Sequence, residues 1–392
     1  MEFFKNPKFD FLGKKWYFIG VSILVVAGSL VSLAWRGLEY GIDFRGGADV
    51  VLRFAQEPSI DGIRSALTAQ GLGGAQIQKL NLPDNPGAHD VLIRVPPPQG
   101  GGDSPETAEE QGDVSGRVLA ALRSGLAAEV GQAGRLDLNL AGSTEIERDL
   151  EEAFPNQQSM ATAAAAAISS YRDSHGGLFK DVEEARRIAG VSPEVASWLR
   201  DHATAGGFAI RSVDYVGPSV GKDLKRKAQY AILGSLAAML AYIWFRFEKL
   251  AYGISAIVTL AHDAIVALGA VSLTGKEFDL TVLAAVLTIV GYSINDTIVI
   301  FDRVRENVKL RRGDNLERIF NDSINQTLGR TILTTFLVLM VVLTLWLFGG
   351  SRLNPFSFTL LIGMVSGTYS TIYISAPVVI WWRTLVEKKA TA

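Results

Sequence analysis

The chain has 392 residues, of which 48% are hydrophobic, and its formal net charge at pH 7 is −2. This charge balance argues against nucleic acid as a partner, and the absence of cysteine excludes disulfide bonds and thiol chemistry. Four histidines leave few ligands for a transition metal. Neither a catalytic Ser/His/Asp set nor a nucleotide-binding loop occurs, so we expect no cofactor. The apolar residues are instead collected into runs of about 18 or more, the length that spans a bilayer.

Six of these runs predict membrane-spanning helices. The expected spans are Trp16–Ala34, Gln229–Phe245, Leu250–Leu273, Leu280–Phe301, Thr331–Phe348 and Phe356–Trp382. The first run could be a signal peptide because two lysines precede it, but its length favours a retained anchor. With a cytoplasmic N-terminus, the four inner segments carry 16 basic residues and each short outer loop carries one. This asymmetry predicts the orientation of the whole chain.

That orientation divides the chain into five parts. They are a cytoplasmic N-terminus (1–15), the first transmembrane helix (16–35), an outer domain (36–226), transmembrane helices two to six (227–382) and a cytoplasmic C-terminus (383–392). A basic cluster just before the second span could lie along the headgroups of membrane lipids, or could solvate a helix end. Its members are Lys222, Lys225, Arg226 and Lys227.

The outer domain has the pattern of a mixed α+β fold. Strands are expected at 48–54, 75–80, 91–95 and 208–213, and helices at 60–70 and 114–130. The order strand, helix, strand, strand, helix, strand predicts a ferredoxin-like sheet. Residues 142–206 indicate an additional helical insert, either a surface elaboration or a contact site for a partner. Residues 96–105 are rich in proline and glycine and predict a loop.

One carboxylate lies inside an apolar segment. Asp296 precedes the charged pair Asp302 and Arg303 by six residues, about 9 Å along a helix, which predicts a position within the hydrocarbon. Arg330 lies at the start of the next span, where antiparallel packing would bring it to a similar depth. Ionisable residues are expensive in lipid, so they point to a function. The pair could exchange protons, or it could be a static ion pair that joins two helices.

Further polar residues occur near this position. Ser293 and Asn295 precede Asp296 and could line a proton path, although small polar residues also simply pack membrane helices. His262 and Asp263 lie within the third span and could carry protons or make structural hydrogen bonds. Because neighbouring residues of a helix point about 100° apart, these two are expected to face different interfaces.

Two glycine-containing motifs are interpreted as structural. Gly363 and Gly367 form a GxxxG face for close packing against a helix of this chain or of a partner. A second motif follows the first span and comprises Gly41, Asp43, Arg45, Gly46 and Gly47. Its spacing fits neither a Walker loop nor a dinucleotide fingerprint. It therefore predicts a tight turn that opens the outer domain.

Several sequence motifs resemble those of the SecF family, the smaller subunits of the SecD–SecF accessory complex in bacterial Sec protein export. They are GIDFRGG (41–47), VGPSVGKDL (216–224), the RFE turn (246–248), LAHDAIVALG (260–269), GYSINDTIVIFDRVREN (291–307), INQTLGRT (324–331) and LFGG (347–350). The sister subunit SecD is similar in architecture but carries a different aspartate-containing motif in its fourth span. The outer domain is longer than the family usually needs, so the insert inherits no function from the resemblance.

The resemblance implies half of a resistance–nodulation–division (RND) transporter. This is a membrane all-α bundle of six helices with a periplasmic α+β domain between helices one and two. The resemblance also implies residence in the bacterial inner membrane, pairing with a SecD-type subunit, association with the SecYEG channel and contact with the translocating preprotein. It leaves association with YajC- and YidC-type proteins open. Proton entry would drive late export, and the family's proton-relay residues fall on Asp296 and Arg330; whether the ion is H⁺ or Na⁺ stays open.

Two other functions are weighed against export. An RND-type efflux half-transporter for small molecules or lipids predicts an apolar pocket in the outer domain or between spans. The acidic outer segment, with 16 basic and 26 acidic residues over 36–221, mildly disfavours efflux. A scaffold that only stabilises the SecD-type subunit predicts normal export when Asp296 and Arg330 are neutralised.

Overall fold

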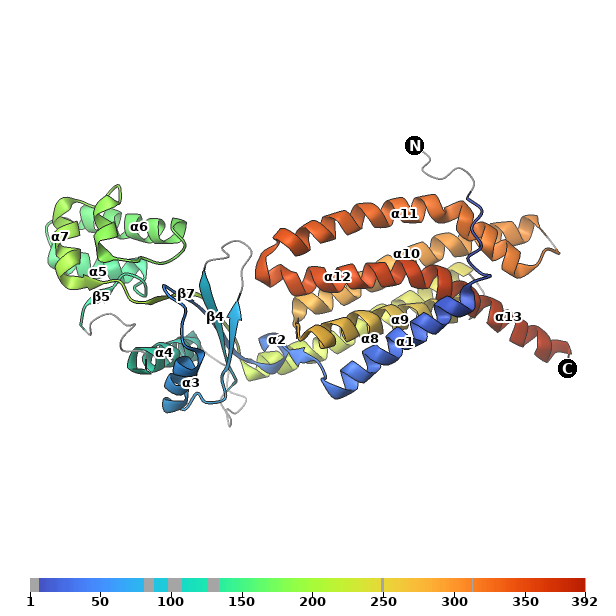
Figure 1. Ribbon diagram of the computed structural model, residues 1–392, viewed down its shortest axis with the longest axis horizontal. Coiled ribbons are helices and arrows are strands. Elements are labelled where there is room, and N and C mark those ends of the chain that lie inside the picture. The colour runs from blue at the N-terminus through green and yellow to red at the C-terminus, as the bar shows by residue number, and fades with distance from the viewer. Residues whose placement is uncertain are drawn as a thin grey trace. The chain divides into compact units, whose positions relative to one another are not determined.

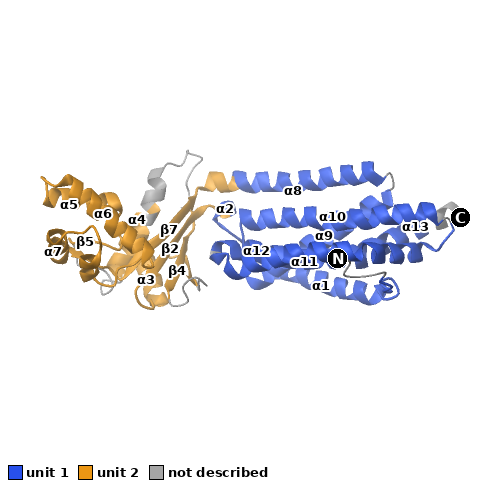
Figure 2. Cartoon of the chain, turned by 90° about the horizontal axis from the view of Figure 1, so that it is seen from above, with its two compact units in different colours: residues 1–44, 223–392 blue, residues 45–222 orange. Residues whose placement is uncertain are grey.

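The computed structural model describes residues 7–80, 88–97, 108–125, 134–247, 250–311 and 313–391. Two compact units divide the chain, one formed by residues 1–44 and 223–392 and the other by residues 45–222 (Figure 2). The first unit is a bundle of long helices (Figure 1). Glu248 of the RFE turn, residues 98–105 of the expected proline-rich loop and residues 126–130 of an expected helix lie outside the described residues.

Six helices of the described chain are long and apolar enough to cross a membrane, and the six expected spans lie within them. The first five are α1 (Lys15–Trp35), α8 (Pro218–Phe247), α9 (Leu250–Thr274), α10 (Leu280–Leu310) and α11 (Leu316–Phe348). The sixth begins as α12 (Gly350–Ser370) and continues through a π-helical turn, η2 (Thr371–Ser375), into α13 (Ala376–Thr391). Several of them, such as α8, α10 and α11, extend well beyond their apolar runs. Charged residues such as Glu, Lys and Arg are good helix formers, so the helix does not end where hydrophobicity ends.

Small residues allow close contacts between these helices. A Cβ atom added to Gly363 of α12 would lie 2.1 Å from Cδ1 of Ile289 on α10, and one added to Gly367 would lie 3.1 Å from Cβ of Ser293. The GxxxG face therefore packs against α10 of the same chain rather than being free for a partner. Gly269 of α9 packs in the same way against Ser29 of α1. Such contacts replace the hydrophobic driving force that is absent between helices in lipid.

An N-terminal strap, residues 7–14, is bound to the start of α11. Asn325 Oδ1 accepts a hydrogen bond from the Phe9 backbone N–H at 2.9 Å, and Asn325 Nδ2 donates to the Phe9 carbonyl at 2.8 Å. One turn earlier, Asn321 Oδ1 accepts from the backbone N–H of Phe11 at 2.8 Å. Leu12 is buried in the hydrophobic core of the bundle. The two asparagines, four residues apart, thus hold the strap by its backbone.

The second unit contains a four-stranded antiparallel sheet in the order β3-β4-β2-β7. Its elements in chain order are β2 (Gly47–Phe54), α3 (Ile60–Ala69), β3 (Gln76–Leu80), β4 (His89–Val95), α4 (Ala108–Gly125) and β7 (Phe208–Val216). This βαββαβ order, with the first strand between the third and the fourth, is the ferredoxin-like arrangement. Alternate residues of the strands, such as Val50 and Ile93, pair across the sheet and are fully buried. They pack against Ile63 of α3 and Leu122 of α4 in one hydrophobic core.

The region 142–206 is folded around its own core. It contains α5 (Ser143–Ala153), α6 (Gln158–Ser174), a 3₁₀ turn η1 (Val182–Arg187) and α7 (Pro193–His202), closed by a short parallel pair of β5 (Leu136–Asp137) and β6 (Ala203–Thr204). The helix α7 begins at Ser192, whose hydroxyl accepts from the Val195 N–H, with proline at the first position. Leu150, Ile168 and Leu199 are fully buried in this core.

A buried ion pair connects this helical region to the sheet. Arg53 of β2 donates from Nε and Nη2 to the two carboxylate oxygens of Asp90 on β4, both at 2.7 Å. Its remaining nitrogen donates to the carbonyl of Gly176, just after α6, at 2.5 Å. The bidentate carboxylate raises the pKa of the Arg53 guanidinium, so this cation stays charged over the whole physiological range.

Candidate functional site in the membrane helices

Asp296 lies on α10 with only 4% of its surface exposed. Its Oδ2 atom has no hydrogen-bond partner among the described residues. Arg330 of α11 acts electrostatically on Asp296, but its side chain is exposed and the two form no direct ion pair in the described part of the chain. The structure therefore does not contain the static ion pair that was the alternative interpretation. A buried polar atom without a hydrogen-bond partner is uncommon in folded proteins and calls for an explanation.

A second buried carboxylate, Asp263 on α9, is surrounded by hydroxyl groups. It is 1% exposed. Ser366 of α12 donates to Oδ1 at 2.7 Å, while Ser293 of α10 and Ser370 of α12 donate to Oδ2 at 2.6 and 2.9 Å. Asp263 thus joins three membrane helices, and we call Asp263 with these three serines the serine cage. Each carboxylate oxygen of Asp263 therefore accepts at least one hydrogen bond from a serine.

The expectation that His262 and Asp263 face different interfaces is wrong. His262 Nδ1 lies 3.0 Å from Asp263 Oδ1, and both side chains are buried. Although the Cα–Cβ bonds diverge, the imidazole is long enough to turn back toward the neighbouring carboxylate. The ring also stacks on Tyr369 of α12 at 6.4 Å between centroids. Its Nε2 atom is buried with no hydrogen-bond partner among the described residues.

Only part of the expected polar set is brought together. Ser293, His262 and Asp263 form one network, whereas Asn295 is exposed and takes no part in it. Ser293 and Asn295 are two residues apart and so lie on nearly opposite sides of α10. Ser293 and Asp296, three residues apart, share a side. Asp296 is therefore about one helical turn from the residue that binds the serine cage.

Several polar residues of α12 and η2 were not expected. Ser366 and Ser370 bind Asp263 directly, and Thr371 lies 3.2 Å from Thr297 of α10 between hydroxyl oxygens. The π-helical turn leaves the Ser375 carbonyl available to accept from Ser255 of α9 at 2.7 Å. Such turns are frequent at functional sites. The sequence signal was the spacing of hydroxyl residues at 366, 370 and 371 within one apolar span.

The first part of the glycine motif after α1 is a structural turn. Asp43, in the short helix α2 (Ile42–Arg45), accepts at Oδ2 from the Leu280 N–H at the start of α10, at 2.9 Å. Just before it, β1 (Glu39–Tyr40) pairs with β8 (Glu277–Phe278). The Phe44 ring stacks on Phe278, with centroids 5.5 Å apart. The motif is therefore held by the loop between α9 and α10.

The glycines that follow start the sheet. Gly46 and Gly47 have φ values of +75° and +118°. A Cβ atom on Gly47 would lie 2.4 Å from the Val95 carbonyl oxygen, so no larger residue fits. Arg45 is exposed. Residues 42–45 thus form the short helix α2, and the chain enters β2 through Gly46 and Gly47.

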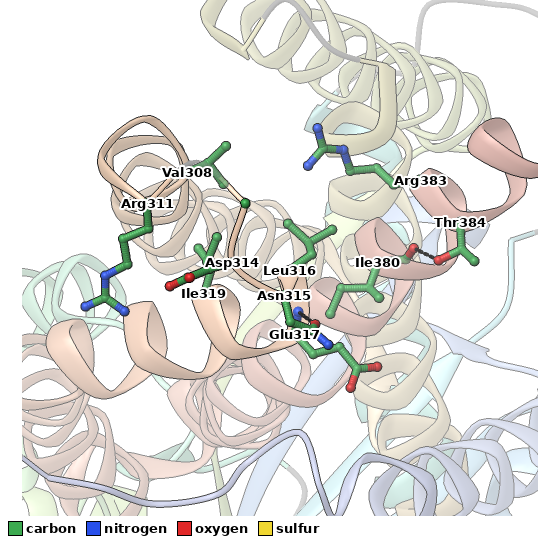
Figure 3. A pocket seen from close by; sticks show the side chains of 11 residues that line it. Val308, Arg311, Asp314, Asn315, Leu316, Glu317, Ile319, Ile380, Arg383 and Thr384 are labelled. Atoms are coloured by element: carbon green, nitrogen blue, oxygen red, sulfur yellow. Dashed lines mark hydrogen bonds between the residues drawn. The ribbon is translucent and has the colours of Figure 1, made fainter. Parts of the chain in front are cut away.

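A cavity of about 610 Å³ lies between the end of α10, the start of α11 and α13. Figure 3 shows Arg311 and Arg383 on opposite sides of it, with Leu316, Ile319 and Ile380 between them. Acidic side chains line it as well, so it differs from the apolar pocket that an efflux transporter predicts. Among the described residues, no group of three histidine, aspartate or glutamate side chains converges on a metal position.

The helical bundle and its buried carboxylates indicate the class of protein to which the chain belongs. A chain with six candidate spans, a ferredoxin-like unit inserted after the first and ionisable residues inside the bundle is a multi-pass membrane transport protein. Residues 195–385 match the family model described as "Protein export membrane protein SecD/SecF, C-terminal".

Curated relatives narrow this class. The chain is 41% identical to "Protein translocase subunit SecF" of Koribacter versatilis over all of this chain and 96% of the relative. It is 31% identical to the SecF of Escherichia coli O157:H7, over 94% of this chain and 86% of that one. The chain belongs to the SecF family of protein translocase subunits, and these comparisons do not favour the efflux alternative.

The solved structures agree with this assignment. The crystal structure of SecDF from Thermus thermophilus, described as a translocon-associated membrane protein, is 28% identical and superposes with a TM-score of 0.64. The comparison covers 97% of this chain and 39% of the SecDF chain. A second SecDF structure, in a super-membrane-facing form, gives a TM-score of 0.55 at 27% identity. This chain therefore spans about two fifths of the solved SecDF chains.

Proposed function

We propose that this SecF-family subunit couples proton entry to the late steps of protein export, with Asp296 as the proton-accepting group and Arg330 as its electrostatic partner. The supporting observation is the buried Oδ2 atom of Asp296, which lacks any hydrogen-bond partner among the described residues. An unpaired carboxylate in an apolar helix is costly, and the neutral acid costs much less. Protonation would remove the charge and with it the attraction to Arg330. The relative energies of two positions of α10 and α11 would then change.

The surroundings of the subunit belong to the same proposal. We place the helical unit in the bacterial inner membrane, and residues 45–222 in the periplasm, where they would meet the emerging preprotein. The 16 basic residues in the inner segments support this orientation. A SecD-type subunit would complete the bundle, because the solved SecDF chains are much longer than this one. The SecYEG channel would be the larger assembly's pore, and YajC- and YidC-type proteins are further candidate partners.

The test is secretion of a model preprotein from cells depleted of their own SecF. The cells would receive wild-type chain or Asp296→Asn at equal membrane levels. Asparagine keeps the size of the side chain but cannot take up a proton, so we expect secretion to fall to the level of cells without the chain. Glu306→Gln is the matched control, because Glu306 is an exposed acid on the same helix that pairs with Arg303. Its secretion should stay at the wild-type level.

Other outcomes would decide between the remaining functions. Full secretion with Asp296→Asn would refute the proton role and leave a scaffold that stabilises the SecD-type subunit. Replacing the proton gradient by a sodium gradient in inverted vesicles would separate the two ions. Translocation driven by the Na⁺ gradient and not by the H⁺ gradient would contradict the proposed proton coupling.

A further inference from the structure

The two buried carboxylates of the bundle have opposite environments. Asp263 lies within hydrogen-bond distance of four groups: the hydroxyls of Ser293, Ser366 and Ser370 and the Nδ1 atom of His262. Asp296 Oδ2 has no hydrogen-bond partner among the described residues, and Asp296 interacts electrostatically with Arg330 and Tyr292. Two acids in one site whose environments differ in this way commonly take different roles.

The cage has a mechanical consequence because its donors come from two helices. Ser293 belongs to α10, whereas Ser366 and Ser370 belong to α12, and all three converge on one carboxylate of α9. Gly367, between the two α12 serines, allows the contact, since its added Cβ would lie 3.1 Å from Cβ of Ser293 and 3.6 Å from Asp263 Oδ2. The position of α10 against α12 is therefore set at the cage, about one helical turn from Asp296.

We propose that Asp263 is a positioning residue for Asp296. Its caged carboxylate keeps α10 packed against α12, so that the Asp296 carboxyl stays out of water, and it does not itself exchange the proton. This inference rests on the proposed proton role of Asp296. His262 contributes the fourth donor when its proton is on Nδ1, because this tautomer lets Nδ1 donate to Asp263 Oδ1.

Titratable and charged groups face the two carboxylates from several helices. Near Asp263, His262 of the same helix contacts the carboxylate, and Tyr369 of α12 stacks on the His262 ring. Around Asp296 they are Arg330 on α11 and Tyr292 on α10. Tyr292 is bound to Thr335 of α11, from its hydroxyl, at 2.9 Å. The three serines donate to Asp263, whereas Asp296 has no such donors among the described residues.

Labelling with dicyclohexylcarbodiimide tests the proposal, because this reagent adds to protonated carboxyl groups in apolar surroundings. The full chain, co-expressed with its SecD-type partner, would be labelled over a pH series and the adducts located by peptide mass spectrometry. In the wild type we expect the adduct on Asp296 and none on Asp263. In Asp263→Asn, water should reach Asp296, and the midpoint of its labelling should move to lower pH by about one unit.

Two further variants keep the result interpretable if Asp263→Asn does not fold. Ser366→Ala and Ser370→Ala each remove one donor, and each should move the midpoint in the same direction by a smaller amount. Ser357→Ala is the matched control, because Ser357 is a fully buried serine of α12 that donates only to its own helix. It should not move the midpoint.

Defined outcomes would overturn the inference. Labelling of Asp263 over the same pH range as Asp296 in the wild type would show that Asp263 exchanges protons. If Asp263→Asn, Ser366→Ala and Ser370→Ala all fold and keep the wild-type labelling curve, the cage does not position Asp296. If Asp296→Asn blocks secretion while the cage variants leave labelling and secretion unchanged, only the positioning role fails. If Asp296→Asn secretes normally, the proposed function itself fails.

Discussion

Replacing Asp90 with alanine tests how the helical region of the second unit is attached to the sheet. The side chain of Asp90 is 0% exposed and that of Arg53 is 8% exposed, so no water replaces the lost carboxylate. Arg53 would keep its hydrogen bond to the Gly176 carbonyl but would become a buried, uncompensated cation. Removing one partner of a buried pair typically costs about 3–5 kcal/mol. At ~1.4 kcal/mol per factor of ten, the lower figure corresponds to roughly a hundredfold change in local opening.

Hydrogen–deuterium exchange of the full chain in detergent measures that opening. Amides of β2, β4 and the segment after α6 should exchange on the order of a hundredfold faster in Asp90→Ala, while amides of α10 and α12 should not change. Asp61→Ala is the matched control, because its ion pair with Arg64 has both side chains more than half exposed, at 92% and 58%. An exposed pair contributes about 0–1 kcal/mol, so exchange should stay close to wild type.

The double variant Arg53→Met with Asp90→Leu separates charge burial from packing. Replacing both partners of a buried pair with apolar residues of similar size is often neutral or stabilising. We therefore expect the double variant to recover much of the protection lost in Asp90→Ala, except at the Gly176 carbonyl. Unchanged exchange in Asp90→Ala, or a double variant as labile as the single one, would refute this account of the ion pair.

Two other predictions concern the helical unit. Gly363→Ala should lower its stability by about 1–3 kcal/mol, because the new Cβ would lie 2.1 Å from Ile289; thermal denaturation in detergent measures this. Gly291→Ala, where an added Cβ meets nothing within 4 Å, is the control, and an equal loss would contradict the packing argument. Asn325→Ala removes its two hydrogen bonds to Phe9 and, by freeing the strap, should speed trypsin cleavage after Lys14 and Lys15. Cleavage at the wild-type rate would show that the Asn325 hydrogen bonds are not needed to hold the strap.

Features that depend on the local chain could be predicted from the sequence. The length of an apolar run reports whether a helix can cross a bilayer, and the observed helices contain all six expected spans. The strand-like composition of segments such as 48–54 similarly predicted the strands, whose order in the ferredoxin-like sheet follows from the succession of strands and helices. Asp296 stood out because a carboxylate inside an apolar helix is rare.

Features that depend on the rotation of one helix against another were decided only by the tertiary structure. From the sequence, Ser293 and Asn295 were equally plausible members of the polar network. In the structure, Ser293 faces α9 and binds Asp263, whereas Asn295 is exposed. The partner of the GxxxG face and the donors from α12 likewise involve residues more than 70 positions apart in the chain. Hydrophobicity and spacing specify which segments form helices, but contacts between distant side chains depend on how those helices pack, because a shift of one residue turns a side chain by about 100°.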